Sequence, residues 1–182
     1  MKIIQEALNG VIVLEPKAFT DSRGYFYESF SLNRYREAGI NYDFVQDNVS
    51  RSVKGTVRGL HYQVGKSSQG KLCQVLHGKV IDVAVDIRFG SPTYGKYVAA
   101  ELSSENHHQI WIPPGFAHGF SVLSDETVFH YKCTNFYNAA DERGIIYNDK
   151  DINIDWKVEN PLVSEKDLKG KLFKDIEKDF IY

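Results

Sequence analysis

The fold is indicated most clearly by residues 77–92, which read HGKVIDVAVDIRFGSP. Apolar side chains recur on one face, at Ile81, Val83, Val85 and Ile87, and alternate with Asp82, Ala84 and Asp86. Strict alternation is typical of a β-strand. The His-Gly pair at 77–78 predicts a tight turn before this strand, and the Gly-Ser-Pro run at 90–92 ends it.

Similar short strands are predicted on both sides of this one. They cover about residues 10–15, 97–102, 109–112, 116–123 and 127–134, with turns rich in Gly, Pro, Ser and Asn between them. Many short strands with such turns indicate an all-β sandwich or barrel. A few short helices are expected at its periphery. One covers residues 32–38, between Ser31 and Gly39, and one lies near the C-terminus, where residues 164–167 resemble a capping sequence and residues 173–180 have helical apolar spacing.

The bulk composition fits a single domain spanning residues 1–182, with 42% apolar and 25% charged residues. A net charge of −2 gives no general attraction to nucleic acid or to an anionic membrane. The sequence predicts neither a signal peptide nor a membrane span. Cys73 and Cys133 are expected to be buried reduced thiols, which favours a cytoplasmic location.

The segment with the most suggestive chemistry is Arg58-Gly59-Leu60-His61-Tyr62-Gln63, followed by Lys71. It combines a histidine able to act as a base near neutral pH with two cations, and we expect them on neighbouring strands. Removing a proton beside a carbonyl needs such a base and a cation that holds the resulting oxyanion. Taken alone, however, the segment fits an ordinary strand with an incidental histidine better than an active site.

Four further segments are rich in groups suited to binding or catalysis. They hold Arg23 and Glu28 (residues 21–28), a polar run (46–50), His118 after a rigid Pro-Gly turn (112–120), and Tyr131 and Glu142 (131–142). Each segment alone has a structural explanation: a loop, a turn, a fold motif or a core tyrosine.

A metal site is not expected. The Pro-x-Gly-x-x-His pattern that ends at His118 resembles the second motif of the cupin superfamily, whose metal ligands usually include a His-x-His pair and a nearby Glu. Here His61 is followed by Gln63, no Glu comes soon after, and Lys71 would repel a cation. These departures favour acid–base chemistry without metal or cofactor.

Taken together and in order, these segments resemble the dTDP-4-dehydrorhamnose 3,5-epimerase family. The matching pieces are Asp21–Phe26, Gln46–Asn48, Arg58–His61, Gln69–Leu72, Asp82–Asp86, Ser91–Thr93, Gly115–Phe120 and Ser164–Asp167. The resemblance implies a cupin-like jelly-roll domain that works without metal or cofactor. It also implies a homodimer with exchanged N-terminal strands and a dTDP-linked 4-keto sugar as substrate.

The resemblance also implies roles for individual residues. His61 would be the proton acceptor, Tyr131 the proton donor, and Asp167 the carboxylate paired with the base. Lys71 is our candidate for holding the enolate oxygen. The expected contacts with the sugar, the diphosphate and the nucleotide, which include stacking of Tyr137 on thymine, are Arg23, Phe26, Glu28, Gln46, Asn48, Arg58, Lys71, His118, Tyr137, Glu142 and Lys166.

The expected reaction is epimerisation of dTDP-4-dehydro-6-deoxy-D-glucose at C3 and C5, in dTDP-L-rhamnose biosynthesis for cell-surface polysaccharide. Three alternatives stay open at this point. They are an epimerase of one centre or of another nucleotide-linked 4-keto sugar, a metal-dependent cupin enzyme, and a non-catalytic nucleotide-sugar-binding module. The binding module has no reason to carry His61, Tyr131 and Asp167 together.

Overall fold

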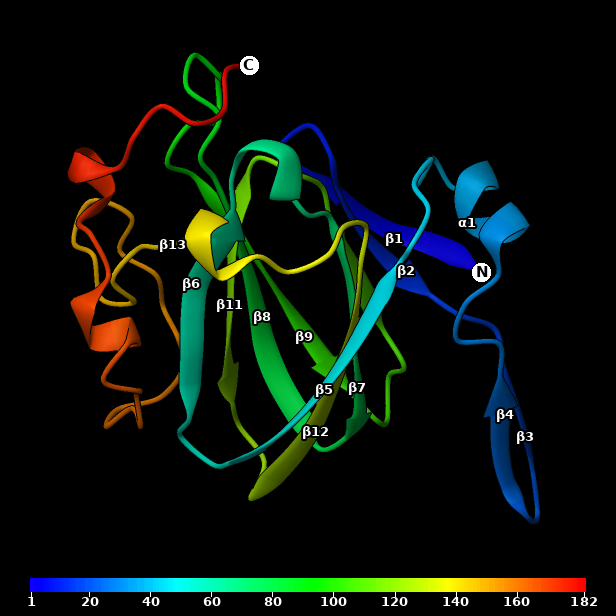
Figure 1. Cartoon of the computed structure of the whole chain (residues 1–182). Helices are drawn as coiled ribbons and strands as arrows, with labels where there is room; N and C mark the ends of the chain where they lie inside the picture. The colour runs from blue at the N-terminus through cyan, green and yellow to red at the C-terminus, as the bar shows by residue number, and fades with distance from the viewer.

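The fold is an open sandwich of two facing antiparallel sheets, seen in a computed structural model that describes residues 1–182 (Figure 1). The six-stranded sheet has the order β1 (Lys2–Ala7), β2 (Val11–Glu15), β10 (Gln109–Ile112), β7 (Lys71–His77), β12 (Glu126–Cys133) and β5 (Gln46–Val53). The five-stranded sheet has the order β13 (Glu142–Gly144), β6 (Val57–Gln63), β11 (Phe116–Val122), β8 (Lys79–Asp86) and β9 (Tyr97–Ser103). The all-β, jelly-roll prediction is confirmed, although the sheets do not close into a barrel.

Strand β8 shows why the sandwich has two core clusters. Its Val80 and Ala84 side chains join the cluster between the sheets, together with Phe120 and Phe129. Its other face, with Val83 and Val85, packs beneath the C-terminal segment, against Ile152 and Trp156 among others. The alternation in residues 77–92 therefore predicted the strand correctly, but both of its faces are buried.

The other predicted strands are also present, as β2, β9, β10, β11 and β12. The expectation that Arg58, His61 and Lys71 lie on neighbouring strands was wrong. Arg58 and His61 lie on β6, whereas Lys71 lies on β7, which belongs to the opposite sheet. The two strands face each other across the sandwich and are not neighbours. The side chains still point toward one space, since both faces that carry them turn inward.

The helix prediction holds near the N-terminus and fails near the C-terminus. Helix α1 (Leu32–Glu37) follows Ser31, whose carbonyl accepts from Tyr35 N–H at 3.0 Å, and Gly39 follows with φ 90°. After residue 163 the structure has only the single 3₁₀ turns η3 (Asp167–Lys169) and η4 (Phe173–Asp175), besides η1 (Gly65–Ser67) and η2 (Ala139–Asp141) earlier in the chain.

The C-terminal segment stays extended because its backbone bonds to the sheet region. Lys171 N–H donates to the Gly144 carbonyl at 3.0 Å, and the Phe180 carbonyl accepts from Phe89 N–H at 2.7 Å. The apolar spacing that suggested a helix instead supplies Phe173, Ile176 and Phe180 to the outer core cluster. Tertiary packing thus overrides the local helical pattern.

A hairpin of β3 (Ala18–Asp21) and β4 (Gly24–Tyr27) forms its own two-stranded sheet and extends away from the sandwich (Figure 1). It carries large exposed aromatic side chains, with Phe26 70% exposed. Tyr25 and Tyr27 pack beside His107, whereas Phe19 and Phe26 belong to none of the core clusters of their own chain. No helix in the structure is long and apolar enough to cross a membrane.

Candidate active site

His61 is held by a carboxylate that lies 106 residues away in the sequence. Its Nε2 atom lies 2.7 Å from Oδ1 of Asp167, and Oδ2 of Asp167 accepts from Gly59 N–H at 3.1 Å. Burial opposes ionisation of Asp167, but its hydrogen bonds, chiefly with His61, outweigh this and lower its pKa. The pair leaves Nδ1 of His61 as the free ring nitrogen, on a side chain that is 31% exposed.

A cavity of about 640 Å³ lies between the two sheets beside this pair. His61 and His118 line it from the five-stranded sheet, and Lys71 and Tyr131 line it from the six-stranded sheet. This volume is within the range of pockets that hold small-molecule ligands. The cavity therefore brings a possible base and a possible acid to opposite sides of one bound molecule.

Tyr131 is a largely buried tyrosine at the edge of the core. Burial, reinforced by the neighbouring thiols of Cys133 and Cys73, raises its pKa to about 12. Lys71 Nζ lies 5.8 Å from the centre of its ring. The phenol is therefore protonated at neutral pH, with a cation close by.

Polar side chains continue from this cavity toward its mouth. Arg58 Nε donates to Ser52 Oγ at 3.0 Å, which fixes the guanidinium over β5. On the same strand Gln46 Nε2 donates to Asn48 Oδ1 at 3.1 Å, and the Gln46 amide oxygen accepts from Tyr137 N–H at 3.0 Å. Gln46, Asn48 and Tyr137 border a smaller cavity of about 210 Å³, which shares His61, Lys71 and Tyr131 with the larger one.

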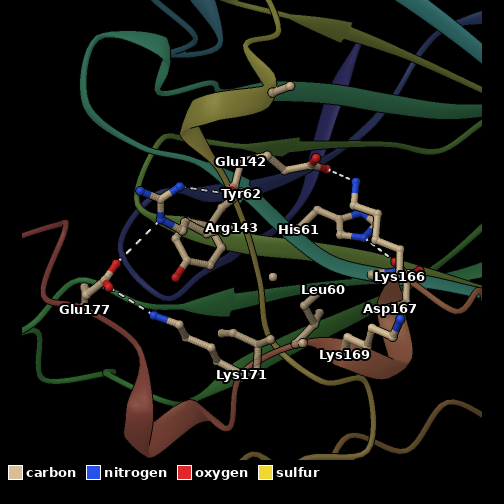
Figure 2. Close-up of a pocket in the computed structure, with 15 residues that line it drawn as sticks. Leu60, His61, Tyr62, Glu142, Arg143, Lys166, Asp167, Lys169, Lys171 and Glu177 are labelled. Carbon is tan, nitrogen blue, oxygen red and sulfur yellow. Dashed lines mark hydrogen bonds and ion pairs between the residues drawn. The ribbon is translucent and has the colours of Figure 1, made fainter.

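Figure 2 shows the lining of a third cavity, of about 270 Å³, which shares His61, Lys166 and Asp167 with the main cavity. Lys166 Nζ lies 2.5 Å from Oε1 of Glu142, and Oε2 of Glu142 accepts from the Tyr137 hydroxyl at 2.9 Å. Burial opposes ionisation of Glu142, but these two partners outweigh it and lower its pKa. The dashed lines in Figure 2 mark the Glu142–Lys166 contact beside His61.

The sequence did not single out Asp82, yet this aspartate contacts a predicted site residue. It is fully buried, and both of its carboxylate oxygens lie 3.0 Å from Nε2 of His118. Burial lowers the pKa of His118, and the Asp82 charge opposes this change. The available signal was an acidic residue at an inward position of the alternating strand, but alternation alone does not reveal its partner.

Cys73, Asp82 and His118 bring potential metal-ligand atoms within 4.8 Å of one another. However, Nε2 of His118 already bonds to Asp82, and neither Cys73 nor Asp82 lines the cavity that His118 borders. At the position of the usual cupin ligand, Gln63 accepts from Asn138 N–H at 2.9 Å. This geometry fits hydrogen bonding better than metal binding.

The structure brings most of the predicted site residues together. Arg58, His61, Lys71, His118, Tyr131, Asp167, Asn48 and Lys166 line the main cavity, and Gln46, Tyr137 and Glu142 line the adjoining one. Arg23, Phe26 and Glu28 are the exceptions, because they lie on the protruding hairpin or just after it. There Arg23 pairs with Asp21 and Glu28 with Arg34.

The open jelly-roll sandwich and the acid–base groups between its sheets indicate a cupin-like enzyme. Residues 5–175 match the family model described as dTDP-4-dehydrorhamnose 3,5-epimerase, and the chain belongs to this family.

Its relatives match along nearly the whole chain. The dTDP-4-dehydrorhamnose 3,5-epimerase of Shigella flexneri is 54% identical over 176 residues, which cover 96% of this chain and 97% of the relative. The Legionella pneumophila epimerase, solved in complex with dTDP-4-keto-L-rhamnose, is 52% identical with a TM-score of 0.91, covering 94% of this chain and 93% of that one. A dTDP-4-dehydrorhamnose 3-epimerase of Streptomyces niveus is 34% identical over 168 residues, covering 92% of this chain and 81% of the relative.

Proposed function

We propose that the protein epimerises dTDP-4-dehydro-6-deoxy-D-glucose at C3 and C5, giving dTDP-4-dehydro-L-rhamnose for dTDP-L-rhamnose biosynthesis. The observation that carries this proposal is the position of the His61–Asp167 pair and Tyr131 on opposite walls of one cavity. A base on one face and an acid on the other are what inversion of a carbon centre requires. The family of the chain supports the choice of substrate.

In the proposed mechanism, Nδ1 of His61 removes a proton from a carbon next to the 4-keto group. The electrons of the broken C–H bond form an enolate, whose charge rests on the C4 oxygen. Asp167 keeps the ring in the required tautomer and stabilises the imidazolium, as the acid of a Ser-His-Asp triad does. Lys71 holds the enolate oxygen, and loss of one such preorganised group typically costs about 3–4 kcal/mol of barrier.

Tyr131 then gives its proton to the opposite face of the same carbon, which inverts the centre. Its pKa of about 12 keeps the hydroxyl protonated before the reaction. Donation remains favourable, because the enolate is the stronger base. The phenolate regains a proton from solvent, His61 loses the one it took, and the cycle repeats at the second carbon.

The remaining polar groups would bind the nucleotide diphosphate and the sugar. Arg58 suits bidentate contact with the diphosphate, and His118 contacts the sugar. Tyr137 offers a ring for stacking on thymine, since it is 50% exposed and held through its hydroxyl by Glu142. The other proposed contacts with the nucleotide sugar are Gln46, Asn48, Glu142 and Lys166.

The hairpin suggests that the working unit is a homodimer with exchanged N-terminal strands. Arg23, Phe26 and Glu28 would then complete the cavity of the partner subunit, because the β3–β4 hairpin, on or beside which they lie, extends away from the sandwich of its own chain (Figure 1). Burial of the exposed rings against a second copy would stabilise the pair.

We further propose that residues 1–182 act as one domain in the cytoplasm, without metal, cofactor, nucleic acid or membrane as partners. Strands β8 and β11 contribute to both core clusters, which supports a single domain. A chelator should leave activity unchanged. Activity lost to the chelator and restored by added metal would favour the metal-dependent alternative.

The direct test is an NMR assay of dTDP-4-keto-6-deoxyglucose in deuterated buffer, which follows exchange at C3 and C5 separately. Deuterium at both carbons with formation of the L-rhamno product is expected. Exchange and inversion at one carbon would favour the single-centre alternative, which the 3-epimerase relative keeps open. Binding without exchange at either carbon would favour a non-catalytic module.

A further inference from the structure

The interior of the sandwich holds two histidine–aspartate pairs side by side. His61 and His118 are directly opposite each other in the β6–β11 ladder. Each ring bonds through Nε2 to a carboxylate, His61 to Asp167 and His118 to Asp82. The side chains differ in exposure, 31% for His61 and 7% for His118, so only the first resembles a base with access to solvent.

The side chain of Asp82 has no hydrogen-bond partner other than His118. Both of its oxygens lie 3.0 Å from Nε2, and its side chain is fully buried in a region that also holds Val80, Ala84 and Phe120. A buried carboxylate with so few hydrogen bonds is costly, and an apolar residue of similar volume is often at least as stable. Stability therefore does not explain an aspartate here, whereas an effect on His118 does.

The contact determines which ring nitrogen of His118 is available to the cavity. Because the carboxylate accepts from Nε2, the proton is held on that nitrogen and Nδ1 is left free. Asp82 and Cys73, the groups near Nε2, do not line the cavity, whereas His118 does. Burial lowers the pKa of His118, which favours a neutral ring with an acceptor lone pair on Nδ1.

We propose that Asp82 is a positioning residue that fixes the tautomer of His118, so that Nδ1 accepts a hydrogen bond from a hydroxyl of the bound sugar. The inference rests on the proposed function, because it places a hydroxylated sugar in this cavity. His118 would then be set as an acceptor, in contrast to Lys71, which is a donor only.

The test is Asp82→Asn, which keeps the size of the side chain. The amide of the new residue can donate to Nε2, which moves the ring proton to Nδ1 and turns an acceptor into a donor. We expect KM to rise about tenfold or more, with a smaller effect on kcat, because the sugar hydroxyl loses its partner. The ¹⁵N NMR spectrum of the labelled ring should show protonated Nε2 in the wild type and protonated Nδ1 in the variant.

Two controls separate positioning from a general structural effect. Asp86→Asn alters another fully buried aspartate of β8, but this one pairs with Arg88 and Ser91, so KM should not change. In a His118→Asn background, Asp82→Asn should add little, since it acts through the ring that is already absent.

The outcomes also separate this inference from the proposed function. If the wild-type ring carries its proton on Nδ1, the inference is overturned even when Asp82→Asn fails to fold. An unchanged KM in a folded Asp82→Asn variant would overturn it as well, while the epimerase activity stands. Absence of epimerisation in the wild type would instead remove the proposed function, and the ring NMR would still report the tautomer.

Discussion

At the scale of single residues, His61 and Tyr131 line the same cavity but differ in their surroundings. The Asp167 carboxylate lies 2.7 Å from Nε2 of His61, which leaves Nδ1 free on a partly exposed side chain. Burial keeps Tyr131 protonated, with its pKa near 12. In the proposed mechanism His61 takes a proton and Tyr131 gives one, so substitutions should separate their roles.

Tyr131→Phe should slow inversion far more than hydrogen exchange. His61 can still form the enolate, but no acid remains on the opposite face, so a solvent proton returns to the original face. We expect a loss in inversion of about 10²–10⁴-fold, the usual range for a general acid. Exchange and inversion are both measured by NMR in deuterated buffer, and equal losses would argue against a donor role.

Asp167 should also link stability to pH. Its pKa is lowered below 3.8 in the folded protein, so its contribution to stability is fully present above the unfolded value and is lost as pH falls through the folded value. Thermal unfolding at several pH values should therefore show that Asp167→Asn lowers Tm near pH 7. This difference should shrink below about pH 4. A difference in Tm between the wild type and Asp167→Asn that stayed constant down to pH 2 would contradict a lowered pKa of Asp167 in the folded protein.

At the scale of elements, close contact between β6 and β11 keeps His61 and His118 in place. A Cβ on Gly119 would lie 2.7 Å from the Arg58 carbonyl oxygen and 3.1 Å from Trp156 Cη2. The backbone oxygen cannot move without shifting β6. A glycine is therefore needed at position 119 so that β6 and β11, the strands that carry His61 and His118, can lie this close together.

Gly119→Ala should lower the stability by about 1–3 kcal/mol, the usual cost of overpacking a core. It should also reduce activity, because β6 carries His61. A denaturant titration and an activity assay would check both effects. Gly144→Ala on the other side of β6 is the milder comparison and should cost less, since its Cβ would lie 3.3 Å from the Leu60 carbonyl oxygen, against 2.7 Å from the Arg58 carbonyl oxygen at Gly119. Equal effects of the two substitutions would show that the approach of β6 and β11 has no special role.

The strands could be predicted because alternation is a local signal, as in β8. The prediction of a C-terminal helix was wrong. Phe173, Ile176 and Phe180 are partly buried because they pack against the sheet, and not because they share one face of a helix. The ordered set of motifs in the sequence also predicted most of the residues that line the candidate site. It could not show that β6 and β7 face each other from opposite sheets, or that Asp82 meets His118, because both depend on how the sheets stack.

At the scale of the whole molecule, three of the predicted contacts do not belong to the cavity of their own chain. Arg23, Phe26 and Glu28 lie on or beside the hairpin that extends from the sandwich. A single chain therefore leaves its cavity without these groups and most of its hairpin exposed. A dimer that exchanges the hairpins would resolve both features.

Mixing two inactive variants should test this arrangement. In a hybrid of Arg23→Ala and His61→Ala subunits, one cavity would combine an intact His61 with an intact Arg23 from the other chain. Co-refolding should therefore restore up to about one active cavity in each hybrid dimer, measured by epimerisation and by size-exclusion chromatography. Refolding each variant alone is the control. No recovery in a verified hybrid would contradict a site shared between chains.

The long sequence separation of His61 and Asp167 has a consequence for biosynthesis. At about 5–20 residues per second, a ribosome needs roughly 5–20 s to add the 106 residues between them. During that interval the nascent chain contains His61, the proposed base, without its carboxylate partner. On the proposed mechanism, activity requires Asp167 to have been added, and a chain released before that residue would lack the paired base.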